Sequence, residues 1–140
     1  MGDMGDLIAV LATLLPSAAA DPCLVVEGLD VQRQIAYARA DPAALDAVYA
    51  EGSAAGTADR QVLTEYRDRG ITVRGARLER RSCERLADDR VRSVERLGAA
   101  VAVLPDATQR DLPRDNWNER DVTLVVEEGR WRIRDVRERR

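Results

Sequence analysis

The 140-residue sequence contains no histidine, and this absence removes much of the familiar chemistry of active sites. Histidine is the commonest general base, so Ser–His and Cys–His nucleophile pairs are excluded, together with most zinc sites. The side chains that remain for chemistry are the carboxylates, three tyrosines and two cysteines. The sequence therefore predicts neither a metal site nor a cofactor.

Two stretches have ligand-like spacing but fail in detail. Residues 111–121 are acidic, yet Trp117 occupies an EF-hand ligand position counted from Asp115, and the required glycine is missing. Gly52 and Gly56 are spaced somewhat like the glycines of a phosphate-binding loop, but no lysine follows them and no strand precedes them. Both stretches are predicted to be loops.

The two cysteines, Cys23 and Cys83, lie 60 positions apart and leave two alternatives. In an exported domain, a disulfide between them would tie the first helix to the first strand and stabilise the fold by about 4 kcal/mol on a loop-entropy argument. In a cytosolic domain, both are small buried apolar side chains.

Composition predicts one globular domain, because 45% of the residues are apolar and the chain has the length of a single domain. All 22 basic residues are arginine, which we interpret as the codon bias of a GC-rich, actinobacterial genome. The net charge is −6 over residues 1–69 and +3 over residues 70–140, where arginines adjoin acids, as at Arg80, Arg85 and Arg96. This pattern predicts a solvated, self-paired sheet face and no nucleic-acid binding; an anion-binding or membrane-surface stripe is the alternative.

Residues 1–20 form an apolar N-terminal segment that has three interpretations. Leu7 to Leu15 is too short to span a bilayer, and Ala18 and Ala20 have the spacing of a signal-peptidase site, but no positive charge precedes them. The segment is a signal peptide without its basic start, the end of a membrane anchor, or an amphipathic helix packed on the domain. We expect export or attachment to the cell envelope, with a cytoplasmic location as the alternative.

Start and stop signals predict three helices in the first half of a domain spanning residues 21–140. Asp21 and Pro22 begin the first, which runs to about Arg39. A second, short helix follows Asp41-Pro42 and ends at Gly52, and a third begins near Thr57 after a loop at 52–56 and stops at Gly70. One apolar face of the first helix is marked by Leu24, Gly28, Val31, Ile35 and Ala38.

From Ile71 onward, apolar and polar residues alternate, which predicts strands. The first strand runs to Cys83 with a kink at Gly75, and a turn at 87–89 leads into the second strand. The latter spans Arg90 to Leu104 with a bend at Gly98, and residues 105–119, with two prolines, form an irregular connection. The final hairpin, Asp121 to Val136, turns tightly at Gly129.

This order of elements resembles the nuclear-transport-factor-2-like superfamily, which includes SnoaL-like cyclases, ketosteroid isomerases and accessory domains of bacterial envelope proteins. The resemblance covers roughly residues 23–137 and rests on Asp41-Pro42-x-x-Leu45-x-x-x-Tyr49, Gly70-Ile71-x-Val73 and Gly129-x-Trp131-x-Ile133-x-x-Val136. It implies an α+β fold in which three N-terminal helices pack on a curved antiparallel sheet of about four strands. Members of the superfamily often have an apolar pocket inside this cone and a dimer formed through the sheet face.

The resemblance also implies where a ligand would lie. Ketosteroid-isomerase-like members use an interior carboxylate with a tyrosine donor, and the candidates here are Tyr37, Tyr49, Tyr66 and Glu95, with Trp131 at the pocket mouth. None of them matches a catalytic motif residue by residue, so no catalytic residue is assigned. The alternative for the tyrosines is packing in the core or at its rim.

We therefore expect a non-catalytic binding or assembly module of the bacterial cell envelope, which contacts a protein partner or a second copy through the sheet face. The alternative is a protein that binds a small apolar molecule inside the cone, or an enzyme of the isomerase, cyclase or dehydratase kind. Membrane association would be made through the N-terminus. A cone plugged by Leu, Val and Ile favours the module, and an open pocket with a carboxylate or tyrosine pointing into it favours the alternative.

Overall fold

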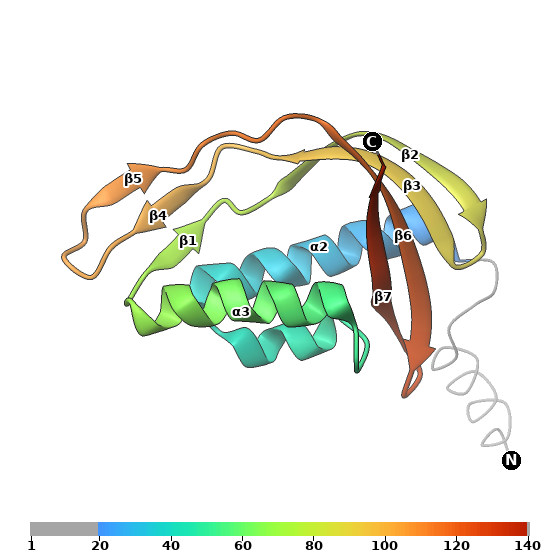
Figure 1. The fold of residues 1–140 in the computed structure, drawn as a ribbon, viewed down its shortest axis with the longest axis horizontal. Coiled ribbons are helices and arrows are strands. Elements are labelled where there is room, and N and C mark those ends of the chain that lie inside the picture. The colour runs from blue at the N-terminus through green and yellow to red at the C-terminus, as the bar shows by residue number, and fades with distance from the viewer. Residues whose placement is uncertain (1–19, 140) are drawn as a thin grey trace, which may run out of the picture.

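The structure is a computed structural model that describes residues 20–139. Three helical elements come first, and strands follow: α2 (Pro22–Arg39), the 3-10 helix η1 (Pro42–Ala47) and α3 (Ala54–Asp68). Figure 1 shows these helices lying beneath a curved sheet. The predicted α+β class is confirmed. The apolar segment at residues 1–19, for which we predict export or anchoring, lies outside the described residues.

The strands form two antiparallel sheets, ordered β1-β4-β5 and β2-β3-β6-β7. The chain passes directly from one sheet to the other three times, from β1 to β2, from β3 to β4 and from β5 to β6. The two sheets therefore form one continuous, bent surface, which is not closed into a barrel (Figure 1). The strand bounds are β1 Thr72–Arg74, β2 Leu78–Ala87, β3 Arg90–Leu97, β4 Val101–Val103, β5 Gln109–Asp111, β6 Asn118–Glu127 and β7 Arg130–Arg139.

Several predicted boundaries are confirmed by the local chemistry of the chain. Asp21 caps α2, because its carboxylate accepts a hydrogen bond from the Cys23 backbone N–H at 2.9 Å. Gly75 has a φ of +72°, which produces the kink between β1 and β2. At the tip of the last hairpin Glu128 and Gly129 both have positive φ, as a two-residue turn requires.

Other boundaries were predicted wrongly. Helix α3 begins at Ala54 rather than near Thr57, because the Ser53 hydroxyl accepts the Gly56 N–H at 3.1 Å and caps the helix earlier. The second helix is a 3-10 helix that ends before Gly52. Residues 105–119 are not wholly irregular, since β5 pairs with β4 inside them and β6 already begins at Asn118; the two prolines fall outside both strands.

The apolar face predicted for α2 is not the face that packs on the sheet. Leu24, Val31 and Ile35 are exposed over 65%, 52% and 44% of their surface. The opposite side of the helix is buried instead, through Val26 and Leu29 together with Ala36 and Tyr37. Because α2 carries apolar residues on both sides, spacing alone does not identify the packing side.

The core lies between the helices and the inner face of the sheet. It contains the fully buried side chains Leu45, Leu63, Val91 and Leu124. The segment after η1 joins this core to β7, because Ala50 N–H donates to the Ile133 carbonyl and Ile133 N–H donates to the Val48 carbonyl, both at 2.8 Å. This contact fixes the position of Tyr49, which lies between Val48 and Ala50. No helix in the described part of the chain has the length and hydropathy needed to cross a membrane.

Candidate functional site

A cavity of about 570 Å³, hereafter the chamber, opens between helices α2 and α3 and the inner face of the sheet. Much of its wall is apolar and comes from Val26, Ala55, Val62, Leu97, Val122 and Ile133. Its polar lining includes Asp30, Arg33, Tyr49, Asp59, Glu95 and Arg120. The space between the helices and the sheet is therefore partly open beside the packed aliphatic core.

Asp59 from α3 is the centre of the first polar group in the chamber. Arg33 donates to both carboxylate oxygens, through Nε at 2.6 Å and a terminal nitrogen at 3.0 Å. The hydroxyls of Tyr37 and Tyr49 donate to Asp59 Oδ1 and Oδ2 at 2.5 and 2.7 Å. Both oxygens of this buried carboxylate are thus fixed by donors from α2 and from the segment after η1.

The hydrogen bonds set the charge state of this group. Burial would raise the pKa of Asp59, but the hydrogen bonds and charge of Arg33, followed by the two tyrosine hydroxyls, outweigh it and hold that pKa below its ordinary value. Burial raises the pKa of Tyr37 and of Tyr49, so both phenols stay protonated as donors. The group is a closed network of one anion, one cation and two neutral donors.

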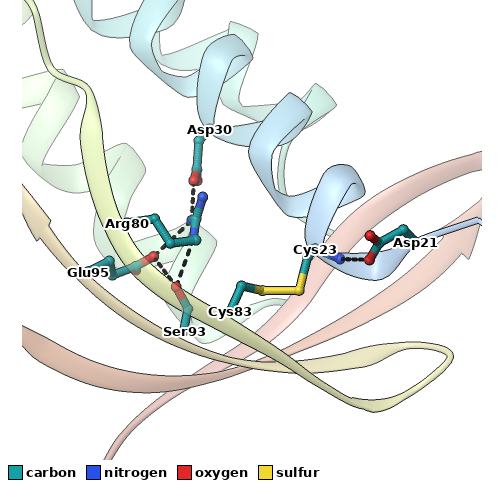
Figure 2. The surroundings of a disulfide bond; sticks show 7 residues. All are labelled: Asp21, Cys23, Asp30, Arg80, Cys83, Ser93 and Glu95. Carbon is teal, nitrogen blue, oxygen red and sulfur yellow. Dashed lines mark hydrogen bonds and ion pairs between the residues drawn. A yellow bond between two sulfur atoms is a disulfide. The ribbon is translucent and has the colours of Figure 1, made fainter.

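A second polar group lies on the inner face of the sheet, around the buried Glu95 of β3 (Figure 2). Its Oε2 accepts from Arg80 at 2.9 Å and from the Ser93 hydroxyl at 3.0 Å. Its Oε1 accepts from Arg120 at 3.2 Å. Arg80 also donates to Ser93 and to Asp30 of α2, and so links the helix to the sheet.

Asp30 differs from Asp59 and Glu95, the carboxylates at the centres of the two polar groups. Its Oδ2 accepts from Arg80 at 2.5 Å, and its Oδ1 accepts no hydrogen bond from the described residues. Burial raises the pKa of Asp30, and this effect exceeds the opposing one of Arg80. Of Asp30 and Asp59, Asp30 is therefore the carboxylate that is freer to exchange a proton.

A second cavity, hereafter the groove, has a volume of about 880 Å³ and lies between α2 and β2. Asp30 and Leu78 line both the groove and the chamber, so these two residues stand between them. The groove has a mixed lining of polar residues such as Arg77, apolar residues such as Val31, and the glycines Gly75 and Gly98.

Of the five candidate site residues named from the sequence, two line the chamber and three do not. Tyr49 and Glu95 line the chamber. Tyr37 contributes its hydroxyl to Asp59, and Tyr66 packs edge-on against the Tyr37 ring at 6.2 Å, but neither lines the chamber. Trp131 packs half-buried against the core and lines neither cavity.

Sequence reasoning missed most of the charged residues in the two polar groups, namely Asp30, Arg33, Asp59, Arg80 and Arg120. A local signal exists for α2, where Asp30, Arg33 and Tyr37 recur at helical spacing beside Val26 and Leu29. That row of polar residues within an apolar face indicates buried partners. No comparable signal marks Asp59 or Arg80, whose partners are distant in the sequence.

Cys23 and Cys83 form a disulfide in the structure, with their Cα atoms 6.1 Å apart (Figure 2). It joins the first turn of α2 to β2, beside the Asp30–Arg80 ion pair. Of the two alternatives left open by the sequence, the structure has the disulfide. Within residues 20–139, no cluster of three or more His, Cys, Asp or Glu side chains is arranged to hold a metal ion.

The outer face of the sheet carries arginines that are paired with acids. Arg92 lies 3.0 Å from Asp121 and 3.5 Å from Glu119, and Arg139 contacts the same two carboxylates. Elsewhere on the sheet Arg96 pairs with Glu79 at 3.0 Å and stacks on the Trp117 ring at 4.2 Å. These contacts match the self-paired face predicted from the sequence, but the prediction was wrong for Arg80, which is largely buried and pairs with Asp30 and Glu95 beneath the sheet.

Comparison with known proteins supports the fold. No protein-family model matches the chain, and no curated protein matches it. Among solved structures, the intermembrane space region of chloroplast protein ARC6 matches with a TM-score of 0.57 at 14% identity, over 88% of this chain and 98% of that one.

Two further solved structures are similar. A domain of unknown function with a cystatin-like fold from Nostoc punctiforme gives a TM-score of 0.53 at 10% identity, over 85% of this chain and 76% of that chain. A protein from Novosphingobium aromaticivorans, described as a candidate scytalone dehydratase, gives 0.50 at 15% identity, with 84% of each chain covered. At these identities the likeness concerns the fold alone. The chain has the cystatin-like, nuclear-transport-factor-2-like α+β fold, which binding modules and enzymes share.

Proposed function

We propose that this protein binds a small, largely apolar molecule, and that the part of the molecule inside the chamber carries no charge. The observation that carries the proposal is the chamber itself, an open space of about 570 Å³. Aliphatic side chains form much of its lining, and polar side chains from separate helices and strands point into the same space. Small-molecule sites have this composition, since apolar walls supply affinity and a few fixed polar groups orient the ligand.

The charged side chains in and beside the chamber favour an uncharged occupant. Asp59 is paired with Arg33, and Glu95 is paired with Arg80 and Arg120. Asp30 shares Arg80, and the remaining acids of the chamber lining, Asp115 and Glu138, are exposed. A charged group would have to break one of these pairs, which leaves a buried charge without its partner at a cost of several kcal/mol.

The outer surface of the sheet gives little support to binding of a partner mainly through the sheet. The large exposed apolar side chains in the described part of the chain are Leu24, Val31, Ile35, Val62 and Val126. Of these, only Val126 lies on a strand. The outer face instead carries ion pairs such as Arg92–Asp121, which remain solvated when no partner is bound.

The disulfide supports an oxidising compartment for this activity. Disulfides persist outside the reducing cytosol, and Cys23–Cys83 is of the kind that fastens a small exported domain. We place the protein outside the cytoplasm, at the cell envelope or secreted. Mass-spectrometric counting of free thiols in protein from the native host tests this placement, and two free thiols would contradict it.

Fluorescence titration with N-phenyl-1-naphthylamine, a neutral apolar probe, tests the chamber as a binding site. The wild-type protein is expected to bind one probe molecule with enhanced emission. Ala58 is exposed and lines the chamber, so Ala58→Trp places an indole at its edge and is expected to weaken binding about tenfold or more.

The matched control is Ala54→Trp, which adds the same ring to an exposed position of α3 that does not line the chamber. This variant is expected to bind the probe as the wild type does. Absence of binding to the wild type, or equal binding by both variants, would refute the chamber as the site.

One observation favours a second candidate, an enzyme that moves protons in the chamber. Asp30 combines an uncommitted oxygen with a raised pKa, as a general acid or base requires. In such a reaction the Asp30 carboxylate would take a proton from a carbon beside a carbonyl group, leaving an enolate and a neutral acid. The proton would then return to the substrate or pass to water.

Deuterium exchange into 2-tetralone, a neutral bicyclic ketone, tests this second candidate by proton NMR in D₂O. Wild-type protein is expected to speed the exchange, and Asp30→Asn is expected to lose that effect while still binding N-phenyl-1-naphthylamine. Exposed Asp46→Asn is the control. Exchange at the same rate with the wild type and Asp30→Asn would reduce the function to binding alone.

A further inference from the structure

The groove between α2 and β2 is larger than the chamber, and the proposed function does not use it. Its two walls come from Glu27, Val31 and Gln34 of α2 and from the stretch between Gly75 and Cys83. Cys83 is bonded to Cys23, so the disulfide joins the two walls of the groove. Figure 2 shows this crosslink close to the Asp30–Arg80 ion pair. The separation of the walls is therefore fixed before any ligand binds.

The polar side chains of the groove include some that are free to meet a ligand. Arg80 and Glu79 are already paired, the first with Asp30 and Glu95 and the second with Arg96. Glu27, Gln34 and Arg77 form no side-chain hydrogen bond or ion pair with the other described residues. The groove thus offers one free acid and one amide on its helix wall, and one free arginine on the opposite wall.

The groove and the chamber are adjacent, since Asp30 and Leu78 line both of them. Each cavity alone has the volume of a site for a drug-sized molecule. One ligand that passed Asp30 and Leu78 would therefore have its apolar part among the aliphatic side chains of the chamber. Its other end would lie between Glu27 and Arg77, where a polar group carrying both signs of charge would be complementary.

We propose that the ligand of the chamber is an elongated amphiphile with a zwitterionic head, and that the groove holds this head. The cationic part of the head pairs with Glu27, and the anionic part pairs with Arg77. The apolar chain enters the chamber past Asp30 and Leu78. This inference rests on the proposed function, because it names the class of molecule that the chamber takes.

Displacement of N-phenyl-1-naphthylamine by dodecylphosphocholine tests the inference when the amphiphile is kept below its critical micelle concentration. Dodecylphosphocholine is expected to displace the probe from the wild-type protein, because its chain competes for the chamber. Phosphocholine without the chain is expected not to displace it. Failure of dodecylphosphocholine to displace a probe that does bind would overturn the inference and leave the chamber as a site for smaller molecules.

Two substitutions test the role of the groove in recognising the head. Glu27→Gln and Arg77→Gln each remove one free charge, and each is expected to weaken dodecylphosphocholine about threefold to tenfold. Neither should change the affinity for N-phenyl-1-naphthylamine, which has no charged head. Dodecyl maltoside, whose head is uncharged, should bind to the wild type and to both variants with equal affinity.

The matched controls are Glu65→Gln and Arg69→Gln, which remove exposed charges that line neither cavity. Both controls are expected to bind dodecylphosphocholine as the wild type does. Equal affinity of all four variants for this amphiphile would refute a head bound between Glu27 and Arg77. A uniform loss in all four would indicate a general effect of substitution that does not depend on contacts in the groove, and would refute it equally.

The Val31 methyl groups supply an independent measurement, since Val31 lines the groove and not the chamber. In methyl NMR, dodecylphosphocholine is expected to shift Val31 and Val122 together, whereas N-phenyl-1-naphthylamine should shift Val122 alone. Shifts at Val122 alone with both compounds would confine the ligand to the chamber and overturn the inference only. No binding of N-phenyl-1-naphthylamine to the wild type would instead remove the proposed function itself.

Discussion

At the scale of single residues, the chamber shows how the same side-chain type takes different roles. Asp59 has both oxygens bonded by Arg33, Tyr37 and Tyr49, so it serves structure. Asp30 is bonded by Arg80 on one side only, so it keeps capacity for a ligand or a proton. The number of fixed donors, and not burial by itself, separates these two carboxylates.

Removing Asp59 is expected to be strongly destabilising. Asp59→Ala leaves Arg33 largely buried without its partner, and the free energy of unfolding should fall by about 3 kcal/mol or more. Asp46→Ala removes the exposed partner of Arg60 and should change it by less than about 1 kcal/mol. Urea denaturation of both variants checks this difference, and equal losses would contradict it.

The two carboxylates are expected to respond to pH in opposite directions. The pKa of Asp59 lies below its ordinary value of 3.8, so its stabilising contribution is present above pH 3.8 and is lost as the pH falls through the lowered pKa. The pKa of Asp30 lies above 3.8, so its contribution is present below pH 3.8 and is lost as the pH rises through the raised pKa.

Urea denaturation between about pH 3 and pH 7 checks these signs. As the pH rises, Asp30→Asn should gain stability relative to the wild type, since Arg80 keeps Glu95 as a partner. Asp59→Asn should lose stability relative to the wild type over the same change. Parallel curves for both variants would mean that the two environments do not differ.

At the scale of elements, replacing each of two helical glycines by alanine is expected to change the free energy of unfolding in opposite directions. Gly28→Ala adds a Cβ that meets nothing within 4 Å, so the free energy of unfolding should rise by about 0.5–1 kcal/mol. Gly56→Ala places a Cβ 2.7 Å from Tyr49 Cβ, so it should push Tyr49 from Asp59 and destabilise the fold. Thermal unfolding of both variants measures this contrast, which fails if the two shifts have the same sign.

The disulfide is expected to hold the first turn of α2 on β2. Replacing Cys23 and Cys83 together by alanine should lower the free energy of unfolding by about 4 kcal/mol, because the crosslink joins residues 60 positions apart. Urea denaturation of the variant, and of the wild type with and without reductant, checks this value. Unchanged stability on reduction would show that the crosslink is not formed in solution.

Local signals in the sequence predicted the elements that depend on local chemistry. The cap at Asp21, the kink at Gly75 and the tight turn at Gly129 each follow from the conformational needs of one residue. The side of α2 that packs could not be predicted, because apolar residues such as Leu24 and Val26 occupy both of its sides. Only the position of the sheet decides between them.

A pocket inside the cone was the alternative expectation from the sequence, and the charged residues that line the chamber were mostly not predicted. Tyr49 and Glu95 were recognised through a family resemblance, and both line it. Asp59 and Arg33 lie 26 positions apart on separate helices, and Arg80 reaches Asp30 across 50 positions. Such pairs arise from the approach of elements in space, which spacing along one element does not encode.

At the scale of the whole molecule, a bent antiparallel sheet lies over two long helices (Figure 1), and the chamber opens between them. The buried ion pairs Arg33–Asp59 and Arg80–Glu95 hold helix to helix and strand to strand around that space. We interpret these pairs as fixing one geometry more than adding net stability, which suits a preformed binding site.

Methyl NMR of the protein labelled at Ile, Leu and Val, titrated with N-phenyl-1-naphthylamine, tests the chamber most directly. The largest shift changes are expected at Val26, Val122 and Ile133, whose side chains line the chamber. The exposed methyl groups of Leu24 and Ile35 outside the chamber should change little. Shift changes confined to the exposed methyl groups, or no changes at all, would contradict the central claim that the cone is hollow and binds a ligand.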